Sequence, residues 1–524
     1  MNSFLLYLRK NRTLLITVAV LLFLLLLAIQ GMKTQDWVVT LLRSLSVAAV
    51  TFLVASGFSL IFGLLDVLNL AQGTLFMVGA YVAWTIYVRP DTFVDLLTPF
   101  CLLVAGFTLL PLWDFLASHM SGRNILGRLW PWAAILLSGS LLFLTLKVYP
   151  VAMWDPGVYS QSPGTFSLLV ETGARIPPLP ATFGDKSSVL VLGGILFGSL
   201  LLAFSLAGLQ NGRNAGAGVN KRLRLPWTYI VSFVAVLGVG LIVFVFNTPL
   251  TTAILGLGSN WLFFIAIVTA LLIGVMLGSL IEATLIRPLY SRPIYQLMIT
   301  LGLSAVGIEL VRAIWGRPEF TMPKPAFFNG TGVNCPALTL AGIFQDHCST
   351  ILFMNSRIRV YNEIFIPLVG LVVLVGIWIL LQRTRIGMII RAGVQDREMV
   401  EALGINVRRV FTFVFALGVG LAILGGALAG PSMGISTAMG ESLLLNALIA
   451  LAIGGLTSYP GAAVGSLLVG LMQQFIIKYG QIGIQLPFLA EPFKPTPPLV
   501  PASTVLLMVV ILLVLPRGLL GRKE

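Results

Sequence analysis

The 524-residue sequence has few charged residues, few cysteines and few histidines. Only 10% of its residues are charged and 57% are hydrophobic, whereas a soluble globular protein has about 25% charged and roughly 45–50% apolar residues. So little charge cannot cover the surface of a water-soluble enzyme of this length, and so much apolar sequence excludes a disordered chain. Three cysteines and two histidines leave almost nothing for a disulfide scaffold or a metal site. The composition is that of a polytopic membrane protein.

Apolar stretches long enough to cross a membrane recur along the whole chain. A helix needs about 20 apolar residues to span roughly 30 Å of hydrocarbon, where lipid offers the backbone no hydrogen-bond partner. We therefore predict an all-α, polytopic transmembrane helical bundle of about fourteen spans. The predicted spans are residues 13–30, 38–62, 67–88, 97–117, 130–149, 187–209, 227–247, 261–285, 297–315, 363–382, 410–430, 441–457, 462–478 and 501–516.

The first apolar stretch, 13–30, follows basic residues, as a signal peptide would. It is longer than the usual apolar region of about 7–15 residues and lacks a clean small-x-small cleavage site. We therefore expect a retained helix, with a cleaved signal peptide as the alternative.

Basic residues gather on one side of the membrane in the topology that these spans define. With the N-terminus in the cytoplasm, the cytoplasmic segments hold twenty basic residues and four acidic ones, and the opposite loops hold equal numbers of each. This is the distribution that the positive-inside rule describes, and it places both termini in the cytoplasm. The net charge of +14 therefore implies no nucleic-acid partner.

Polar and glycine-rich residues interrupt two of the predicted helices, near 63–73 and 454–461. Irregular backbone at membrane depth is tolerated only where it is buried in protein or lines a wet cavity. We predict broken or re-entrant helices at both places, with tight turns at the membrane surface as the alternative. The candidates for lining a translocation pathway there are Asn69, Gln72, Gly73, Gly454 and Gly455.

The two amides of the first interruption, Asn69 and Gln72, are three residues apart and share one helical face. An amide that faces lipid without a partner is costly, so we expect both to line the pathway. Interhelical hydrogen bonds are the alternative.

Signatures of enzyme chemistry are missing. The sequence has no Gly-x-x-x-x-Gly-Lys-Ser/Thr phosphate loop and no His-Glu-x-x-His motif. His119 and His347 lie on loops assigned to opposite sides, so they cannot share a metal. Glu309 and Arg312 can form an i, i+3 pair on one helix, which we expect to be structural, with a proton relay as the alternative. Acidic residues near span centres are scarce, which favours energy supplied from outside this chain.

Residues 383–409 form the most informative cytoplasmic segment. Asp396 is placed to cap a short helix, and Gly404 to end it in a left-handed conformation. The apolar face of this helix consists of Met399, Val400 and Leu403. A solvated loop would not need such a face, so we expect a docking helix. The alternative is a helix that lies against its own membrane domain.

Two of the three cysteines, Cys335 and Cys348, fall in the long outer loop 316–362. That loop lies in an oxidising compartment if the topology is right, so we expect a disulfide between them, with two unpaired thiols as the alternative.

Four motifs together resemble one known family. They are Gly63-Leu-Leu-Asp-Val-Leu-Asn-Leu-Ala-Gln-Gly73 with Gly79-Ala-Tyr81, then Arg287-Pro-Leu289 with Thr300-Leu-Gly-Leu-Ser304, then Arg391–Arg409 with Asp396, Gly404 and Ile405, and finally Gly454-Gly-Leu-Thr-Ser-Tyr-Pro-Gly-Ala-Ala-Val-Gly465 with Pro516-Arg-Gly-Leu-Leu-Gly521. They resemble the branched-chain amino acid ABC transporter permeases of bacteria, over about residues 38–90 and 261–523.

The chain also departs from that family. Gln72 stands where the family usually has His, and Val400 where Ala is usual. We divide the chain into an extra N-terminal transmembrane helix (1–37), a first part of the permease core (38–90), a membrane-embedded insertion (91–256) and a second part of the core (257–524) that contains the coupling segment 383–409. The insertion has four predicted spans, an even number, so the family topology is unchanged.

The resemblance implies the permease subunit of an importer for branched-chain or other hydrophobic amino acids. It implies a second permease subunit, two ATP-binding subunits that carry ATP and Mg, an extracytoplasmic solute-binding protein, and the bacterial inner membrane as location. This chain itself is expected to hold no cofactor and no metal and to be no enzyme. The residues implied in coupling to the ATPase are Asp396, Met399, Leu403, Gly404 and Ile405.

Other functions stay open at this point. The substrate could be urea, an amide or another small polar solute. An ATP-independent secondary carrier or channel would share the composition, and a membrane enzyme would need a polar cluster that the sequence does not show.

Overall fold

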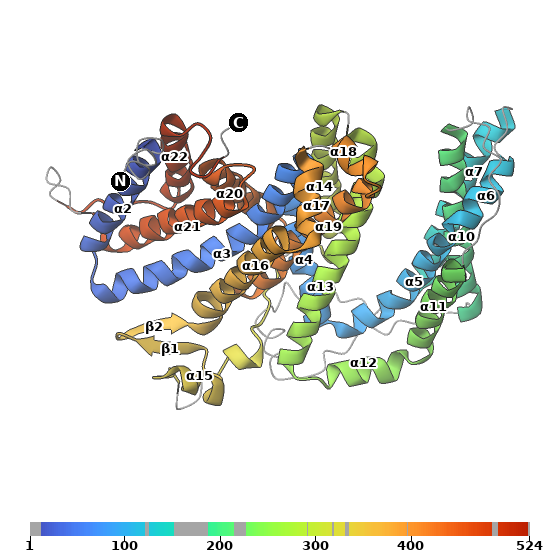
Figure 1. Ribbon diagram of the computed structural model, residues 1–524. Helices are drawn as coiled ribbons and strands as arrows, with labels where there is room; N and C mark the ends of the chain where they lie inside the picture. The colour runs from blue at the N-terminus through green and yellow to red at the C-terminus, as the bar shows by residue number, and fades with distance from the viewer. Residues whose placement is uncertain are drawn as a thin grey trace. The chain divides into compact units, whose positions relative to one another are not determined.

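The computed structural model describes residues 12–120, 125–150, 187–213, 227–290, 292–316, 319–330, 335–395, 397–484 and 491–521. The described chain forms two compact units (Figure 1). The first unit holds the described residues up to Tyr87 and from Ser259 onward, and the second holds those from Val88 to Gly258.

Every predicted span overlaps a helix of the structure. Ten helices among the described residues are long and apolar enough to cross a membrane, and Met439–Gly454 and Leu499–Val514 are shorter apolar helices. The predicted all-α, polytopic bundle is therefore confirmed.

One predicted span is divided in the structure. The stretch 97–117 belongs partly to α5 (Pro90–Thr108) and partly to α6 (Leu110–Met120), which meet at Leu109. Pro111 has no backbone N–H and cannot continue the hydrogen bonds of α5, so a new helix begins there.

The main helices of the first unit, with the two short helices α17 and α18, include the most buried part of the described chain. They are α2 (Arg12–Gln30), α3 (Thr34–Leu65), α4 (Gln72–Val88), α13 (Ser259–Ile281), α14 (Pro293–Trp315), α16 (Ile366–Arg383), α17 (Arg385–Gln395), α18 (Arg397–Ala402), α19 (Val407–Met433), α20 (Met439–Gly454), α21 (Tyr459–Ile482) and α22 (Leu499–Val514). Its shorter segments are η1 (Glu282–Ile286), η2 (Arg287–Leu289), η3 (Ala326–Phe328), α15 (Leu340–Asp346), β1 (Thr350–Phe353), β2 (Ser356–Arg359) and η4 (Val360–Phe365).

Helices α3 and α19 form the centre of this unit. In each of these helices, 78% of an 18-residue apolar stretch is buried, whereas only 11% of the corresponding stretch of α14 is buried. Small residues allow the close packing: a Cβ at Gly57 of α3 would collide with the carbonyl of Gly418 in α19, and a Cβ at Gly470 of α21 with the carbonyl of Ser44. Between apolar helices in lipid, such close approach is a main source of association.

The second unit is a smaller helical bundle with its own core. It contains α5, α6, α7 (Ile125–Val148), α10 (Ser188–Arg213), α11 (Trp227–Val245) and α12 (Asn247–Leu255). Leu102, Tyr149, Val191 and Ile195 form its buried cluster, and the hydroxyl of Ser199 donates to the carbonyl of Leu102 at 2.9 Å. The insertion boundaries expected from the sequence, 91 and 256, stay a prediction.

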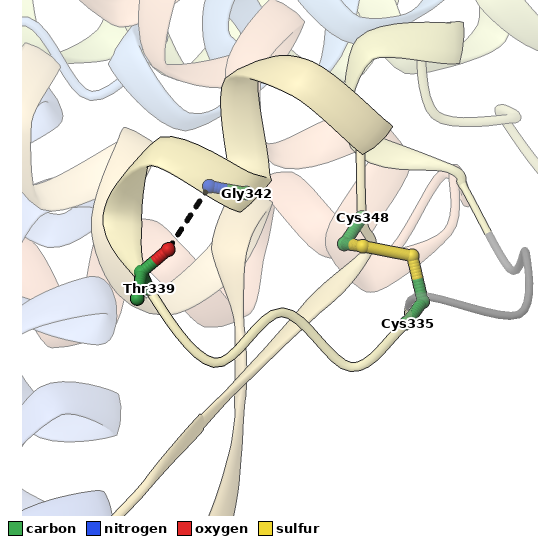
Figure 2. The surroundings of a disulfide bond; sticks show 4 residues. All are labelled: Cys335, Thr339, Gly342 and Cys348. Carbon is green, nitrogen blue, oxygen red and sulfur yellow. Dashed lines mark hydrogen bonds between the residues drawn. A yellow bond between two sulfur atoms is a disulfide. The ribbon is translucent and has the colours of Figure 1, made fainter.

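Residues 335–365 follow α14 at one end of the first unit and form a small disulfide-bonded segment, here called the stapled segment. A disulfide joins Cys335 and Cys348, whose Cα atoms are 5.5 Å apart, and the N-cap Thr339 accepts from the backbone N–H of Gly342 (Figure 2). Strands β1 and β2 pair antiparallel as a hairpin beside α15. Figure 1 shows this segment and the α17–α18 region at opposite ends of the unit.

The stapled segment is tied to the helices through Glu363 in η4. Its carboxylate accepts from Nε of Arg43 in α3 at 3.0 Å and from the backbone N–H of Arg359 at 2.8 Å. Burial lowers the pKa of nearby Lys324, and the positive charge of Arg359 lowers it further, while Glu363 opposes the shift. The segment is thus held by charge as well as by its covalent link.

Replacing both Cys335 and Cys348 by serine should loosen this segment and leave the helical bundle intact. The bond closes a short loop, and the chain-entropy model gives such a closure roughly 3 kcal/mol. Limited proteolysis should cut the variant faster between 335 and 360, while Cys101→Ser, at the free cysteine of α5, should change nothing. Non-reduced peptide mass spectrometry that finds both thiols free in the native protein would contradict the pairing.

Candidate functional site

The polar interruption near 63–73 is a non-helical segment that runs back into the helix bundle. Helix α3 ends at Leu65, and Asp66 follows in the left-handed region with φ of 55°. Helix α4 then begins at Gln72, whose side chain lies against Gly57 of α3. At 1.5 Å per residue, the end of α3 extends about 12 Å beyond that level. Residues 66–71 cover this distance as irregular backbone, so α4 begins inside the protein.

Nearby side chains satisfy the backbone of this segment. The carboxamide oxygen of Asn69 accepts from the N–H of Ala71 at 3.2 Å. The hydroxyl of Thr300 in α14 accepts from the N–H of Leu70 at 3.4 Å, and its single proton lies between the carbonyl of Leu297 in α14 at 3.1 Å and that of Leu68 at 3.4 Å. Buried backbone groups need such partners, because none is available from lipid. The Thr300 motif and the first motif, more than two hundred residues apart, therefore meet here.

Asn69 and Gln72 are fully buried in this conformation and hold helices together. Nδ2 of Asn69 donates to Oε1 of Gln72 at 3.2 Å, and Nε2 of Gln72 donates to the carbonyl of Gly418 in α19 at 2.7 Å. Neither lines a described cavity. These are the contacts of the interhelical alternative, so pathway lining would require the helices to move apart. Gly73 packs against α20, where a Cβ would collide with the carbonyl of Gly440.

The second interruption, near 454–461, is a tight turn between antiparallel helices. Gly454 of α20 faces Gly461 of α21 so closely that a Cβ at either would collide with the other's carbonyl. Gly455 has φ of 109°, and Ser458 caps α21 by accepting from the N–H of Gly461 at 3.1 Å. This is the turn that the sequence left open as the alternative to a broken helix.

The C-terminal motif completes this turn. The N–H groups of Leu519 and Leu520 donate to the carbonyls of Ile453 and Gly454 at 2.8 and 2.9 Å. The last carbonyls of a helix have no partner within it, so the motif caps α20. Gly518, with φ of 74°, allows this close approach.

The segment 383–409 forms two short helices that lead into α19. Thr384 caps the corner between α16 and α17: its hydroxyl donates to the carbonyl of Leu380 at 2.6 Å and accepts from the N–H of Gly387 at 3.1 Å. Helix α18 follows. The predicted capping residue, Asp396, lies outside the described residues.

Helix α18 ends in a Schellman motif centred on Gly404. Gly404 has φ of 80°, in the left-handed region that the sequence predicts for it. Its N–H donates to the carbonyl of Glu401 at 3.0 Å, and the N–H of Ile405 donates to the carbonyl of Val400 at 3.3 Å. Ile405 also packs against Val400, the apolar contact that accompanies this motif. A Cβ at Gly404 would meet nothing within 4 Å, so glycine is required there by conformation and not by space.

The apolar face of α18 is divided between two directions. Val400 is 4% exposed and packs with Val407 and Phe411 of α19, beside Leu65 at the end of α3. Met399 and Leu403 are 61% and 73% exposed. The helix therefore both lies against its own membrane domain and presents two apolar side chains outward.

A buried carboxylate lies next to this region. Glu282 in η1 is fully buried and accepts from Arg287 at 2.6 and 3.1 Å, from the hydroxyl of Tyr290 at 2.8 Å and from the hydroxyl of Thr412 in α19 at 2.7 Å. The ring of Tyr290 meets Phe411 edge to face. Glu282 thereby links the end of α13 to the start of α19, next to the residues of α19 that Val400 of α18 contacts.

Comparison with known proteins now decides the family. A model described as the permease component of branched-chain amino acid transport systems matches residues 40–147 and 186–515. The chain belongs to this family. Because the matched residues include parts of 91–256, the match does not delimit the insertion. The protein is thus a multi-pass membrane permease subunit of an ABC transporter.

Individual relatives of the permease are distant. LivH, the high-affinity branched-chain amino acid transport system permease protein of Escherichia coli K12, is 27% identical over 273 residues, which are 52% of this chain and 78% of that protein. BraD of Pseudomonas aeruginosa, of the same description, is 30% identical over 172 residues, 33% of this chain and 51% of BraD. The fructose import permease protein FrcC of Rhizobium meliloti is 28% identical over 143 residues, 27% of this chain and 39% of FrcC. No solved structure matches the permease.

Several residues of this site were not singled out from the sequence. Glu282 is five residues from Arg287, a spacing that suits a π-helical turn and not the i, i+3 or i, i+4 pairs of an α-helix. The sequence does not distinguish Gly57 and Gly418 as sites of close helix packing, since glycine is abundant in transmembrane helices. Thr300 was part of a motif, but its partner could be found only in three dimensions.

Glu282→Leu should lower the stability of the permease and weaken the junction of α13 with α19. Glu282 is fully buried, whereas the side chain of Arg287 is 35% exposed, so the loss should stay below the roughly 3–5 kcal/mol of an ion pair that is buried on both sides. Thermal unfolding in detergent should show a clear loss for this variant. Glu309→Leu is the matched control, since its pair with Arg312 is exposed and such pairs contribute about 0–1 kcal/mol. Equal losses in both variants would contradict the role of burial.

Cysteine introduced at Asn69 or Gln72 should not react with small polar thiol reagents in the resting permease. Both positions are fully buried, whereas Leu403→Cys, at an exposed position, should react at once. Labelling at 69 or 72 that appears only during ATP turnover would support pathway lining. Labelling that never appears would leave interhelical hydrogen bonding as their whole role.

Proposed function

We propose that this permease forms the translocation pathway of a bacterial importer for branched-chain or other hydrophobic amino acids. The match of the family model over most of the chain carries this proposal, and the relatives LivH and BraD are described as branched-chain amino acid permeases. Similarity to a fructose import permease shows that the scaffold is shared with a transporter of another solute, so amino acid selectivity rests on the stronger matches.

We place the energy supply on partner subunits. The complex would comprise this chain, a second permease subunit, two ATP-binding subunits that hold ATP and Mg, and an extracytoplasmic solute-binding protein. The exposed Met399 and Leu403 on α18 support this arrangement, because two outward apolar side chains on a rigid cytoplasmic helix suit a protein groove better than water. The residues assigned to coupling are Asp396, Met399, Leu403, Gly404 and Ile405.

We place both termini in the cytoplasm of a bacterial inner membrane. The positive-inside distribution supports this orientation, and so does the position of the disulfide segment at the end of the unit opposite α17 and α18 (Figure 1). A disulfide requires an oxidising compartment, and docking to an ATPase requires the cytoplasm.

Reconstitution tests the substrate and the energy source together. The permease, assembled with ATP-binding, second-permease and solute-binding subunits, should import labelled leucine into proteoliposomes only when ATP and Mg are inside. Unlabelled isoleucine or valine should compete, and urea, acetamide and fructose should not. Uptake without ATP would instead indicate a secondary carrier, and competition by urea alone a small-amide permease.

Gly404→Val should lower both ATP hydrolysis and uptake without preventing membrane insertion. A β-branched residue in the left-handed region costs roughly 1–2 kcal/mol, enough to distort the end of so short a helix and turn Met399 and Leu403 away from a partner. Uptake and the ATPase activity stimulated by the binding protein should both fall.

Gly404→Asn is the matched control, since asparagine tolerates the left-handed region, and it should keep most of both activities. Ala402→Val is a second control: it places the same valine side chain at an exposed position within the helix. Wild-type stimulation in the Gly404→Val complex would overturn the coupling assignment.

A further inference from the structure

A cavity of about 630 Å³ lies within the first unit, between three segments of the candidate site. Its walls are the last turns of α3, the corner between α16 and α17, and the turn between α20 and α21. Among the described residues, none of those assigned to the pathway or to coupling lines it. Its size is that of a ligand site and not of a packing defect, since such sites commonly measure about 300–1,000 Å³.

One buried hydroxyl in this wall has no partner. Ser59 of α3 is 3% exposed, and its Oγ makes no hydrogen bond. Two other serines of the same helix behave differently: Ser44 donates to the carbonyl of Thr40 at 2.7 Å, and Ser56 to that of Leu53 at 3.0 Å. A buried hydroxyl without a partner costs free energy, and because the Ser59 Oγ is itself covered, a polar group in the cavity reaches it only after the Ser59 side chain rotates.

The only charged side chain among the described lining residues is Arg391 of α17. Its guanidinium donates to Oε1 of Gln382 at 3.1 Å and, more weakly, to the carbonyl of Gly387 at 3.4 Å. A guanidinium has five N–H donors, so three remain for a ligand. No described carboxylate lines the cavity or pairs with Arg391. Its charge therefore favours an anion, and its planar donors suit a phosphate.

The rest of the wall is largely apolar. Leu60, Leu64, Leu381, Met388 and Leu520 contribute to it. An apolar surface beside a single cation is the pattern expected for an amphiphile. Basic pockets between transmembrane helices at the cytoplasmic face bind anionic lipid head groups.

We propose that this cavity binds an anionic phospholipid of the cytoplasmic leaflet, with its phosphate against Arg391 and Ser59 and an acyl chain along the leucine wall. The proposal rests on the proposed function only for the orientation of α17 toward the cytoplasm. A bound lipid would link the end of α3 to the helix that leads into α18.

Native mass spectrometry of the whole transporter complex tests this site. The complex is exchanged from mild detergent into mixed micelles with phosphatidylglycerol or with phosphatidylcholine of the same acyl chains. The wild type should retain phosphatidylglycerol preferentially. Arg391→Gln should weaken that retention about tenfold, and Ser59→Ala about threefold, with phosphatidylcholine unchanged. Arg385→Gln, on the same helix but outside the cavity, should leave retention as in the wild type.

Three results would overturn the proposal. Equal retention of both lipids would remove head-group recognition, and equal loss in Arg391→Gln and Arg385→Gln would indicate general surface charge. Displacement of phosphatidylglycerol by millimolar inorganic phosphate would assign the site to a free anion. Leucine uptake is measured separately on the same preparations. Uptake without lipid selectivity contradicts only this proposal, whereas lipid selectivity without uptake of any amino acid contradicts only the proposed function.

Discussion

The non-helical backbone between α3 and α4 runs from the exposed Asp66 to the buried Ala71, and its buried groups need hydrogen-bond partners within the protein. This requirement explains why residues from distant parts of the sequence meet there. Thr300 of α14 accepts from the N–H of Leu70, Asn69 accepts from that of Ala71, and Gln72 donates to the carbonyl of Gly418. The approach of α3 to α19 must be close for that last bond to form, so Gly57 and Gly418 have no room for a Cβ. An irregular segment is thus packed against α3 and α19, the two helices at the centre of the unit.

From this segment, a continuous set of contacts leads to the surface of α18. Leu65, the last residue of α3, packs beside Val400 and Phe411, and Phe411 meets Tyr290, which donates to Glu282. These contacts connect α18 to the end of α3 through Leu65 and to the end of α13 through Phe411, Tyr290 and Glu282. The Schellman motif at Gly404 closes α18 at the outer end of this set.

The sequence predicts the helices well because each needs only its own apolar length. It also predicts the left-handed Gly404, since that conformation is a local property of one residue. It could not decide between a broken helix and a turn at 63–73 and 454–461, because the two differ in which distant segment supplies hydrogen bonds. The same limit applies to Asn69 and Gln72: two amides on one face predict a polar partner, and only the packed structure shows that the partner is a carbonyl of α19.

The cap on α20 has a consequence for the order of assembly. Its donors are Leu519 and Leu520, near the end of the chain, whereas its acceptors, Ile453 and Gly454, leave the ribosome more than sixty residues earlier. During synthesis, α20 and α21 can pair while those carbonyls still lack their final partners. The cap of the hairpin is therefore completed only after its own residues have been translated, by a motif more than sixty residues further along the chain.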